Sequence, residues 1–138
     1  MTPWIGFFSN PQALSMYDEP PSLGDVELLD CKYKQGLTTL ELNLSLSDLP
    51  TNRSHRWPAE VNRIALTLQF DVVSSTISQS HSGGEVLKVH CSFRPNEPGF
   101  HFECVGARFN LAAECNYAWI KHLSGYIRAP FGQEQEYA

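Results

Sequence analysis

The sequence predicts a mainly β domain, an antiparallel sandwich of two sheets with about eight strands and a short N-terminal helix. Apolar and polar residues alternate over several runs, as expected for strands that bury one face. Turn-forming residues separate these runs, and 138 residues with 42% hydrophobic and 18% charged side chains suit one folded domain. The alternating runs are residues 40–46, 64–70, 87–93, 100–104 and 109–115.

The N-terminal segment is expected to form a short helix. Asn10 can cap a helix, and Pro11 fits the first helical position because its missing N–H has no partner there. The helix is expected to run to about Tyr17, since Pro20 cannot continue it.

A hairpin is expected next, with strands at residues 25–34 and 37–46 and a turn at Gln35 and Gly36. Period-two alternation places Leu29, Cys31 and Tyr33 together on one face of the first strand. The later strands are expected at residues 63–70, 72–78, 85–94, 100–105 and 108–115, with turns at 80–84, 95–99 and Gly106. Residues 117–127 fit either a helix or a strand, and Gly125 favours a last strand.

One domain is expected over residues 1–138, with its core at about 8–128 and a mobile tail at 129–138. The four cysteines fall singly within expected strands, which favours reduced core thiols over disulfides. The N-terminus does not read as a signal peptide, and no apolar run approaches the roughly 20 residues that span a bilayer. A cytoplasmic protein that does not insert into membranes is therefore expected.

Charge is distributed unevenly along the chain, which has a net charge of −5. No Lys or Arg precedes Lys32, whereas five carboxylates do, namely Asp18, Glu19, Asp25, Glu27 and Asp30. Such a distribution disfavours nucleic acid as a partner and can attract a basic protein. A plain solvated acidic surface explains it equally well.

Catalytic and metal-binding motifs are not evident, so the sequence predicts neither an enzyme nor a cofactor or metal. The histidines and cysteines lack the spacing of a zinc site, and the serines lack the context of a nucleophile elbow. Two alternatives stay open: a β-sandwich that binds a small apolar ligand or a sugar, and, less favoured, a hydrolase.

The order of features along the chain is similar to the bacterial immunity protein family numbered fifty, which is found in polymorphic toxin systems. The matching segments are MYDEPPSL at 16–23, DVEL at 25–28, DLP at 48–50, RWP at 56–58, VNRIALTLQF at 61–70, RFNL at 108–111 and SGY at 124–126. The resemblance covers about residues 8–128. It implies a β-rich cytoplasmic protein that binds a cognate toxin and blocks it, and it implies no catalytic residues.

Two surfaces are expected to bind that partner. The first is the acidic segment, residues 18–30, which would suit a basic toxin. The second is the long loop at residues 47–62, in which Trp57 is either an aromatic anchor for the partner or a plug at the end of the sandwich. The sequence leaves the strand order and the oligomeric state open.

Overall fold

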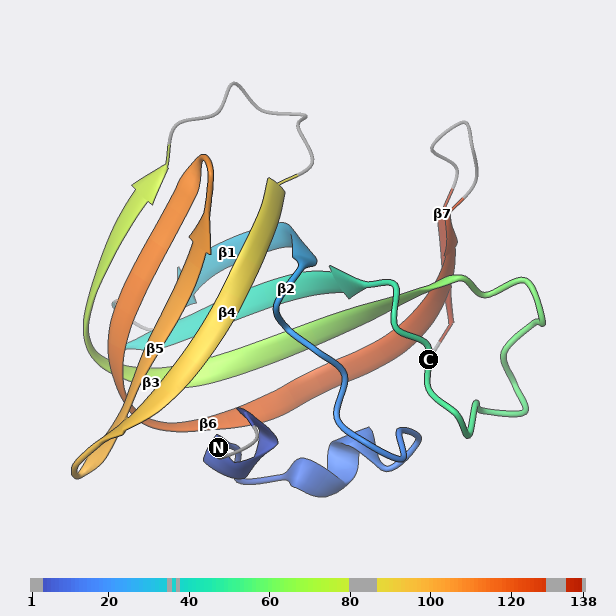
Figure 1. Cartoon of the computed structure of the whole chain (residues 1–138), viewed down its shortest axis with the longest axis horizontal. Coiled ribbons are helices and arrows are strands. Elements are labelled where there is room, and N and C mark those ends of the chain that lie inside the picture. Colours follow the sequence, from blue (N-terminus) through green and yellow to red (C-terminus); the bar gives the residue numbers. More distant parts are fainter. Residues whose placement is uncertain (1–3, 35, 37, 80–86, 129–133, 138) are drawn as a thin grey trace.

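The computed structural model describes residues 4–34, 36, 38–79, 87–128 and 134–137, and it confirms a mainly β protein (Figure 1). The strands are β1 (Val26–Lys34), β2 (Thr39–Leu46), β3 (Arg63–Gln79), β4 (Leu87–Asn96), β5 (Gly99–Gly106), β6 (Phe109–Arg128) and β7 (Glu134–Tyr137). The turn expected at residues 80–84, and the first two residues of the strand expected at 85–94, lie outside the described residues.

These strands form one antiparallel sheet, so the predicted two-sheet sandwich is wrong. Their order is β3-β2-β1-β4-β5-β6-β7, and β3 also pairs with β6. The additional pairing closes β1 to β6 into a ring in which each strand has a neighbour on both sides over part of its length. At one point the ring is closed only by a short contact, between residues 26–28 of β1 and 87–89 of β4.

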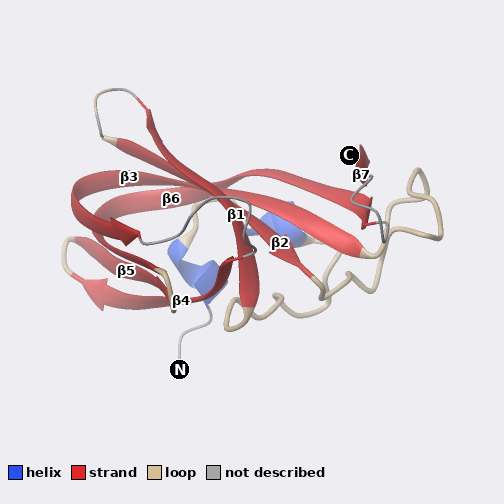
Figure 2. Ribbon diagram, turned by 90° about the horizontal axis from the view of Figure 1, so that it is seen from above, coloured by secondary structure: helices blue, strands red, loops and turns tan. Residues whose placement is uncertain are grey.

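Two strands are much longer than expected, which is why the predicted number of strands is too high. The expected strands at 63–70 and 72–78 are one strand, β3, and those at 108–115 and 117–127 are also one strand, β6. Their mutual register shifts at Val72, opposite Cys115, and the chain bends there (Figures 1 and 2). A β-bulge changes the phase of the inward side chains and increases twist without ending the strand.

The N-terminal segment forms two 3-10 turns, η1 (Trp4–Phe7) and η2 (Pro11–Leu14), instead of one helix to Tyr17. Pro11 occupies the expected first position, but Asn10 does not cap the turn. The Asn10 amide instead donates to the carbonyl oxygen of Ile120 and accepts from its N–H, both at 2.8 Å. Asn10, which was expected to cap the helix, therefore holds the N-terminal segment against β6.

A bulge also changes which side chains β1 buries. The register with β2 shifts between Leu28 and Asp30, so Leu28 is buried and Leu29 is half exposed at 51%. Cys31 and Tyr33 still pack against the core, as expected. The prediction for Leu29 is wrong because the period-two rule does not hold across an extra residue.

The core fills the interior of the ring and is rich in leucine and phenylalanine. Phe70 is fully buried and stacks on Phe102 with ring centroids 4.5 Å apart. Phe8, from the N-terminal segment, contacts the edges of Phe70 and Phe93. The two 3-10 turns thus pack against the ring and complete its core (Figure 1).

All four cysteines are free, and Cys91, Cys104 and Cys115 are buried while Cys31 is half buried. Burial raises the pKa of Cys31 and of Cys115 to about 12. The pKa of Cys91 is raised by its hydrogen bond with Cys104 and then by burial. The side chains of Cys31, Cys91 and Cys115 therefore remain thiols at neutral pH and act as small apolar groups.

The end of the chain adds a short strand to the sheet. Within the segment expected to be a mobile tail, β7 pairs with residues 125–128 of β6. Residues 129–133 lie outside the described part of the chain. None of the helices that the structure describes is long and apolar enough to cross a membrane.

Candidate functional site

The two surfaces expected from the sequence lie side by side at one end of the molecule. The Asn52 N–H donates to the carbonyl oxygen of Met16 at 2.9 Å, and the Asn52 amide donates to a carboxylate oxygen of Asp18 at 3.2 Å. The Tyr17 hydroxyl donates to the carbonyl oxygen of Asp48 at 2.6 Å. The start of the acidic segment and the loop at 47–62 therefore form one continuous surface.

The five carboxylates of the acidic segment do not all gather on that surface. Asp18 and Glu19 are exposed on it, and Asp25 lines a cavity of about 240 Å³ beside Asp48 of the same loop. Asp30 is half exposed and lies 3.8 Å from the ammonium group of Lys32. Glu27 is buried, so it is not accessible to a partner. The acidic run in the sequence thus becomes separate carboxylates in the fold.

Trp57 is buried, with 7% of its surface exposed, and it belongs to the core. Gly125 explains how the indole fits: a Cβ atom there would lie 3.0 Å from the Trp57 ring and 2.8 Å from Val61. The absence of a side chain at Gly125 lets Trp57 pack against the backbone of β6. This placement favours the plug interpretation of Trp57, and its contact with a partner stays a prediction.

A cluster of cations surrounds Glu27, whose side chain is 8% exposed. Its carboxylate lies 2.8 Å from a guanidinium nitrogen of Arg128, 3.4 Å from Arg63 and 3.8 Å from Lys88. Oε2 accepts a hydrogen bond from Arg128 at 3.0 Å, whereas the buried Oε1 accepts none among the described residues. Arg63 also donates to the side chain and the carbonyl of Ser45, both at 3.0 Å. One carboxylate thus holds three cations from three different strands.

Glu41 holds a second cluster of the same kind on β2. Its carboxylate, 6% exposed, lies 2.7 Å from the ammonium group of Lys121, 2.8 Å from Lys34 and 3.7 Å from Lys32. Burial alone would raise the pKa of Glu41, but hydrogen bonds from Lys121 and Lys34 outweigh it and lower the pKa to about 2. The same contact with Glu41 raises the pKa of Lys34.

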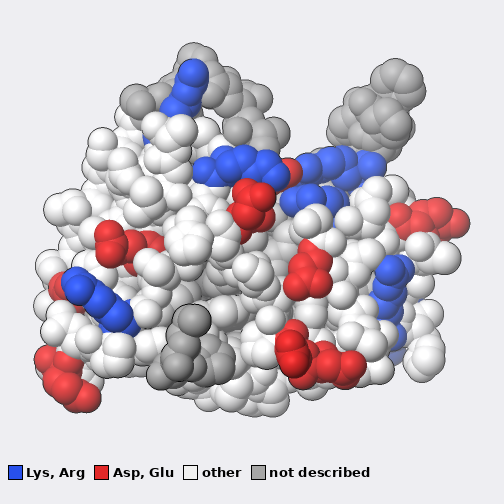
Figure 3. Space-filling view, in the orientation of Figure 1, with Lys and Arg blue, Asp and Glu red and all other residues white. Residues whose placement is uncertain are grey.

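The two clusters lie on the outer face of the sheet, on either side of the polar residues of β2. Glu41, Asn43 and Ser45 alternate with inward leucines on β2, and Ser45 lies opposite Glu27 in the register. Among the side chains that the structure describes, six of the ten Lys and Arg residues of the chain lie here with three carboxylates, an excess of three positive charges. We name these six residues the cationic face: Lys32, Lys34, Arg63, Lys88, Lys121 and Arg128. Figure 3 shows Lys and Arg gathered at the upper centre, with acidic side chains scattered below.

An aromatic pair, in which Tyr117 is exposed and Trp119 is partly buried, lies beside the cationic face. Trp119 continues the row of Glu41 and Gln69 across β3, because each is the register partner of the next. Tyr117, 52% exposed, stacks on Trp119 with ring centroids 5.4 Å apart. The sequence analysis missed this pair, although Tyr117, Trp119 and Lys121 follow the period of two that marks one face of a strand.

We expect the Glu41 cluster to make stability depend on pH. The pKa of Glu41 is about 2 in the folded state, below its ordinary value of 4.5. The ionised carboxylate therefore contributes to the free energy of unfolding above pH 4.5, and this contribution is lost as the pH falls towards 2. Glu41→Gln should cost about 1–3 kcal/mol at pH 7, because hydrogen bonds to a charged group are lost. Urea unfolding of both proteins at pH 7, 5 and 3 measures the difference, which should shrink at pH 3.

Glu19→Gln is the matched control for this measurement, because Glu19 is exposed and no ion pair of it is recorded among the described residues. It should change the free energy of unfolding by less than about 0.5 kcal/mol at each pH. A difference between Glu41→Gln and the parent protein that stays constant from pH 7 to pH 3 would contradict the assignment.

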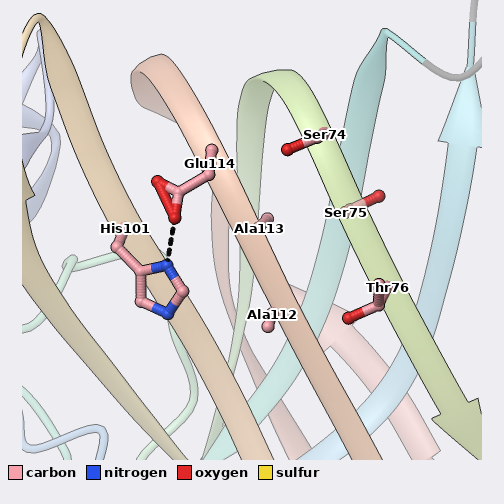
Figure 4. Close-up of a pocket in the computed structure, with 7 residues that line it drawn as sticks. All are labelled: Ser74, Ser75, Thr76, His101, Ala112, Ala113 and Glu114. Carbon is pink, nitrogen blue, oxygen red and sulfur yellow. Dashed lines mark hydrogen bonds and ion pairs between the residues drawn. The ribbon is translucent and has the colours of Figure 1, made fainter.

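A shallow cavity of about 220 Å³ on the other side of the ring contains the residues nearest to a hydrolase site. His101 and Glu114 lie here together with Ser74 and Thr76 (Figure 4). Nδ1 of His101 lies 2.5 Å from Glu114, and Nε2 lies 3.3 Å from Glu103. Hydrogen bonds to His101 and then to Asn96 lower the pKa of Glu114.

The serine hydroxyls in this cavity do not reach the imidazole. Ser74 pairs with Glu114, and Glu114 pairs with His101, so β6 separates the serine from the histidine. Two strand spacings amount to roughly 10 Å, far beyond a hydrogen bond. Ser75 points to the opposite side and bonds to the Tyr33 hydroxyl (Figure 4). Both imidazole nitrogens face carboxylates, so these residues form no nucleophile–base pair.

Metal binding has no support among the described residues, because no three His, Cys, Asp or Glu side chains there are arranged to hold an ion. What the outer surface does offer is a set of fixed charges and exposed aromatic rings. Such an arrangement can bind another molecule and has no evident group to transform it.

Comparison with known proteins identifies a family. The family model of Immunity protein 50 matches residues 10–126. No curated protein and no solved structure matches the chain. The match spans most of the sequence, from Asn10, just before η2, to Tyr126, near the end of β6, and it agrees with the resemblance noted from the sequence. The chain therefore belongs to the Immunity protein 50 family.

Proposed function

We propose that this protein binds the toxin domain of its own toxin system and neutralises it by stoichiometric contact. The family match over residues 10–126 carries the proposal. An inhibitor of this kind needs a rigid scaffold and a complementary surface. The closed ring of β1 to β6 offers the scaffold, and the ion-paired side chains on its outer face offer the surface.

The proposed action is binding without catalysis. The groups most suited to nucleophilic chemistry are unfavourably placed, since Cys91 and Cys115 are buried thiols with raised pKa values. His101 faces two carboxylates instead of a hydroxyl. These features favour an inhibitor over the hydrolase alternative. A ligand-binding role has less support, because the interior is filled by leucine and phenylalanine side chains.

The proposed setting is the cytoplasm of a bacterium that carries a polymorphic toxin, where the protein protects the cell and its siblings. The expectation of a basic toxin came from the net charge and from the acidic segment. The fold separates those carboxylates, so the acidic segment gives a basic partner little support.

Co-expression with the toxin domain encoded beside the gene tests the proposal. Cells that produce the toxin domain alone should stop growing, and cells that produce both proteins should grow. Titration calorimetry should give one toxin per immunity protein and a dissociation constant of about 10 nM or below.

Two results would contradict this function. One is growth arrest that persists at equal expression of the two proteins, together with no binding. The other is inactivation of the toxin at amounts of this protein far below its own, because turnover would indicate an enzyme. His101→Ala should protect as well as the parent protein, since the proposed function does not use the imidazole.

A further inference from the structure

We infer that the cationic face, together with Tyr117 and Trp119, is the surface that docks the toxin, and that the toxin presents an acidic surface to it. This inference rests on the proposed function and specifies where and with what chemistry the partner binds. It reverses the expectation from the sequence, in which the acidic segment met a basic partner.

The charge that reaches solvent on this face is positive. The ammonium side chains of Lys32, Lys34 and Lys121 are 48%, 39% and 42% exposed, and that of Lys88 is 59% exposed. The carboxylates of Glu27 and Glu41 are 8% and 6% exposed, beneath those cations. A partner that approaches the face therefore meets cations first, and an acidic surface complements them.

These cations are also held in place before any partner arrives. The Lys121 and Lys34 ammonium groups lie 2.7 and 2.8 Å from Glu41, and Arg128 lies 2.8 Å from Glu27. Long side chains lose conformational entropy when a partner fixes them, and this loss weakens binding. Here much of that entropy is already lost in the folded protein, so the buried carboxylates preorganise the face.

The aromatic pair supplies what a purely charged surface lacks. Tyrosine and tryptophan are enriched among the residues that dominate binding energy, especially where they can be fully covered. Tyr117 is 52% exposed and stacked on Trp119, so its ring is both accessible and held in one orientation. Lys121 lies on the same strand two residues beyond Trp119, which makes the charged and aromatic parts continuous.

An acidic protein suits this face better than nucleic acid. A phosphate backbone is a continuous row of negative charge, and the Asp30 carboxylate, 51% exposed, interrupts the cations of the face. Separate carboxylates on a protein can instead be placed against individual lysines. The net charge of −5 also disfavours nonspecific contact with nucleic acid.

Association kinetics with the toxin domain test the inference. The double variant Lys32→Glu/Lys88→Glu reverses the two cations with long ion pairs, 3.7 and 3.8 Å from Glu41 and Glu27, so folding should change least. At low salt it should associate about tenfold more slowly than the parent protein, and its rate should depend less on salt. Tyr117→Ala, a variant at an exposed position, should dissociate about tenfold faster.

Arg53→Glu/Arg56→Glu is the matched control, because it makes the same change of net charge on the exposed loop at 47–62. Asp18→Lys/Glu19→Lys tests the acidic segment. Both should keep the association rate within about twofold of the parent protein. If Arg53→Glu/Arg56→Glu associates slowly while Lys32→Glu/Lys88→Glu associates at the rate of the parent protein, the inference is overturned. The docking surface would then be the loop at 47–62.

Failure of the inference differs from failure of the proposed function. If the parent protein binds and protects while all variants on the cationic face behave like it, only the inference fails. If the parent protein neither binds nor protects, the proposed function fails. A labelled single-stranded RNA should not bind the parent protein, and RNA binding that is lost in Lys32→Glu/Lys88→Glu would overturn the assignment of an acidic protein.

Discussion

Replacing Phe70 by alanine is expected to lower the free energy of unfolding by about 3–5 kcal/mol. Phe70 is fully buried, and its ring stacks on Phe102 at 4.5 Å and packs against Phe8 and Phe100 at 5.9 and 6.4 Å. Truncation removes apolar surface from the core and leaves a cavity that rigid strands on both sides cannot fill. The N-terminal segment should lose part of its anchorage, because Phe8 packs on Phe70.

Urea unfolding followed by tryptophan fluorescence measures this loss. Tyr117→Ala is the matched control, since it removes an aromatic ring that is half exposed on the neighbouring strand. Tyr117→Ala should lower the free energy of unfolding by less than about 1 kcal/mol, which is what one pair of side chains on neighbouring strands contributes on a solvent-exposed face. Equal costs for the two variants would contradict the placement of Phe70 at the centre of the core.

Glu27→Gln is expected to destabilise the protein by about 3 kcal/mol, the second large effect. The substitution keeps the shape of the side chain and removes its charge, which leaves the guanidinium of Arg63, 14% exposed, without a counter-ion. Removal of one partner from a buried ion pair is costly because the remaining charge stays desolvated. Arg128 and Lys88 are more exposed and can turn to solvent.

A double variant separates the loss of pairing from the loss of packing. Glu27→Gln/Arg63→Met removes both charges and should recover part of the stability that Glu27→Gln loses. Asp25→Asn, at an exposed carboxylate two residues earlier, should change the free energy of unfolding by less than about 0.5 kcal/mol. If Glu27→Gln unfolds at the same urea concentration as Asp25→Asn, the cluster does not stabilise the fold.

The positions of most strands followed from the sequence, but the way they close did not. Inward leucines at 40, 42, 44 and 46 have 0% to 1% exposure, as period-two alternation requires. Alternation is a local property, and the pairing of β3 with β6 joins residues far apart in the chain. Bulges at Val72 and at Leu29 interrupt the alternation, so β3 and β6 each resembled two strands and one leucine was placed on the wrong face.

The candidate site was less predictable, because charge in a sequence does not show what a charge contacts. Glu27 belonged to an acidic run, yet its partners Arg63, Lys88 and Arg128 come from three other strands. Only the strand order brings them together. Tyr117 and Trp119 were accessible to sequence reasoning, and the ambiguity of residues 117–127 between helix and strand concealed their shared face.

The short contact between β1 and β4 has a consequence for how binding and stability are linked. Glu27 and Lys88 are register partners in that contact, and both belong to the cluster that also recruits Arg63 and Arg128. The shortest strand pairing of the ring therefore lies under the charges inferred to receive the partner. A partner bound across this strand pairing would hold β1 and β4 together. The free energy of binding would then also stabilise the fold against separation of these two strands.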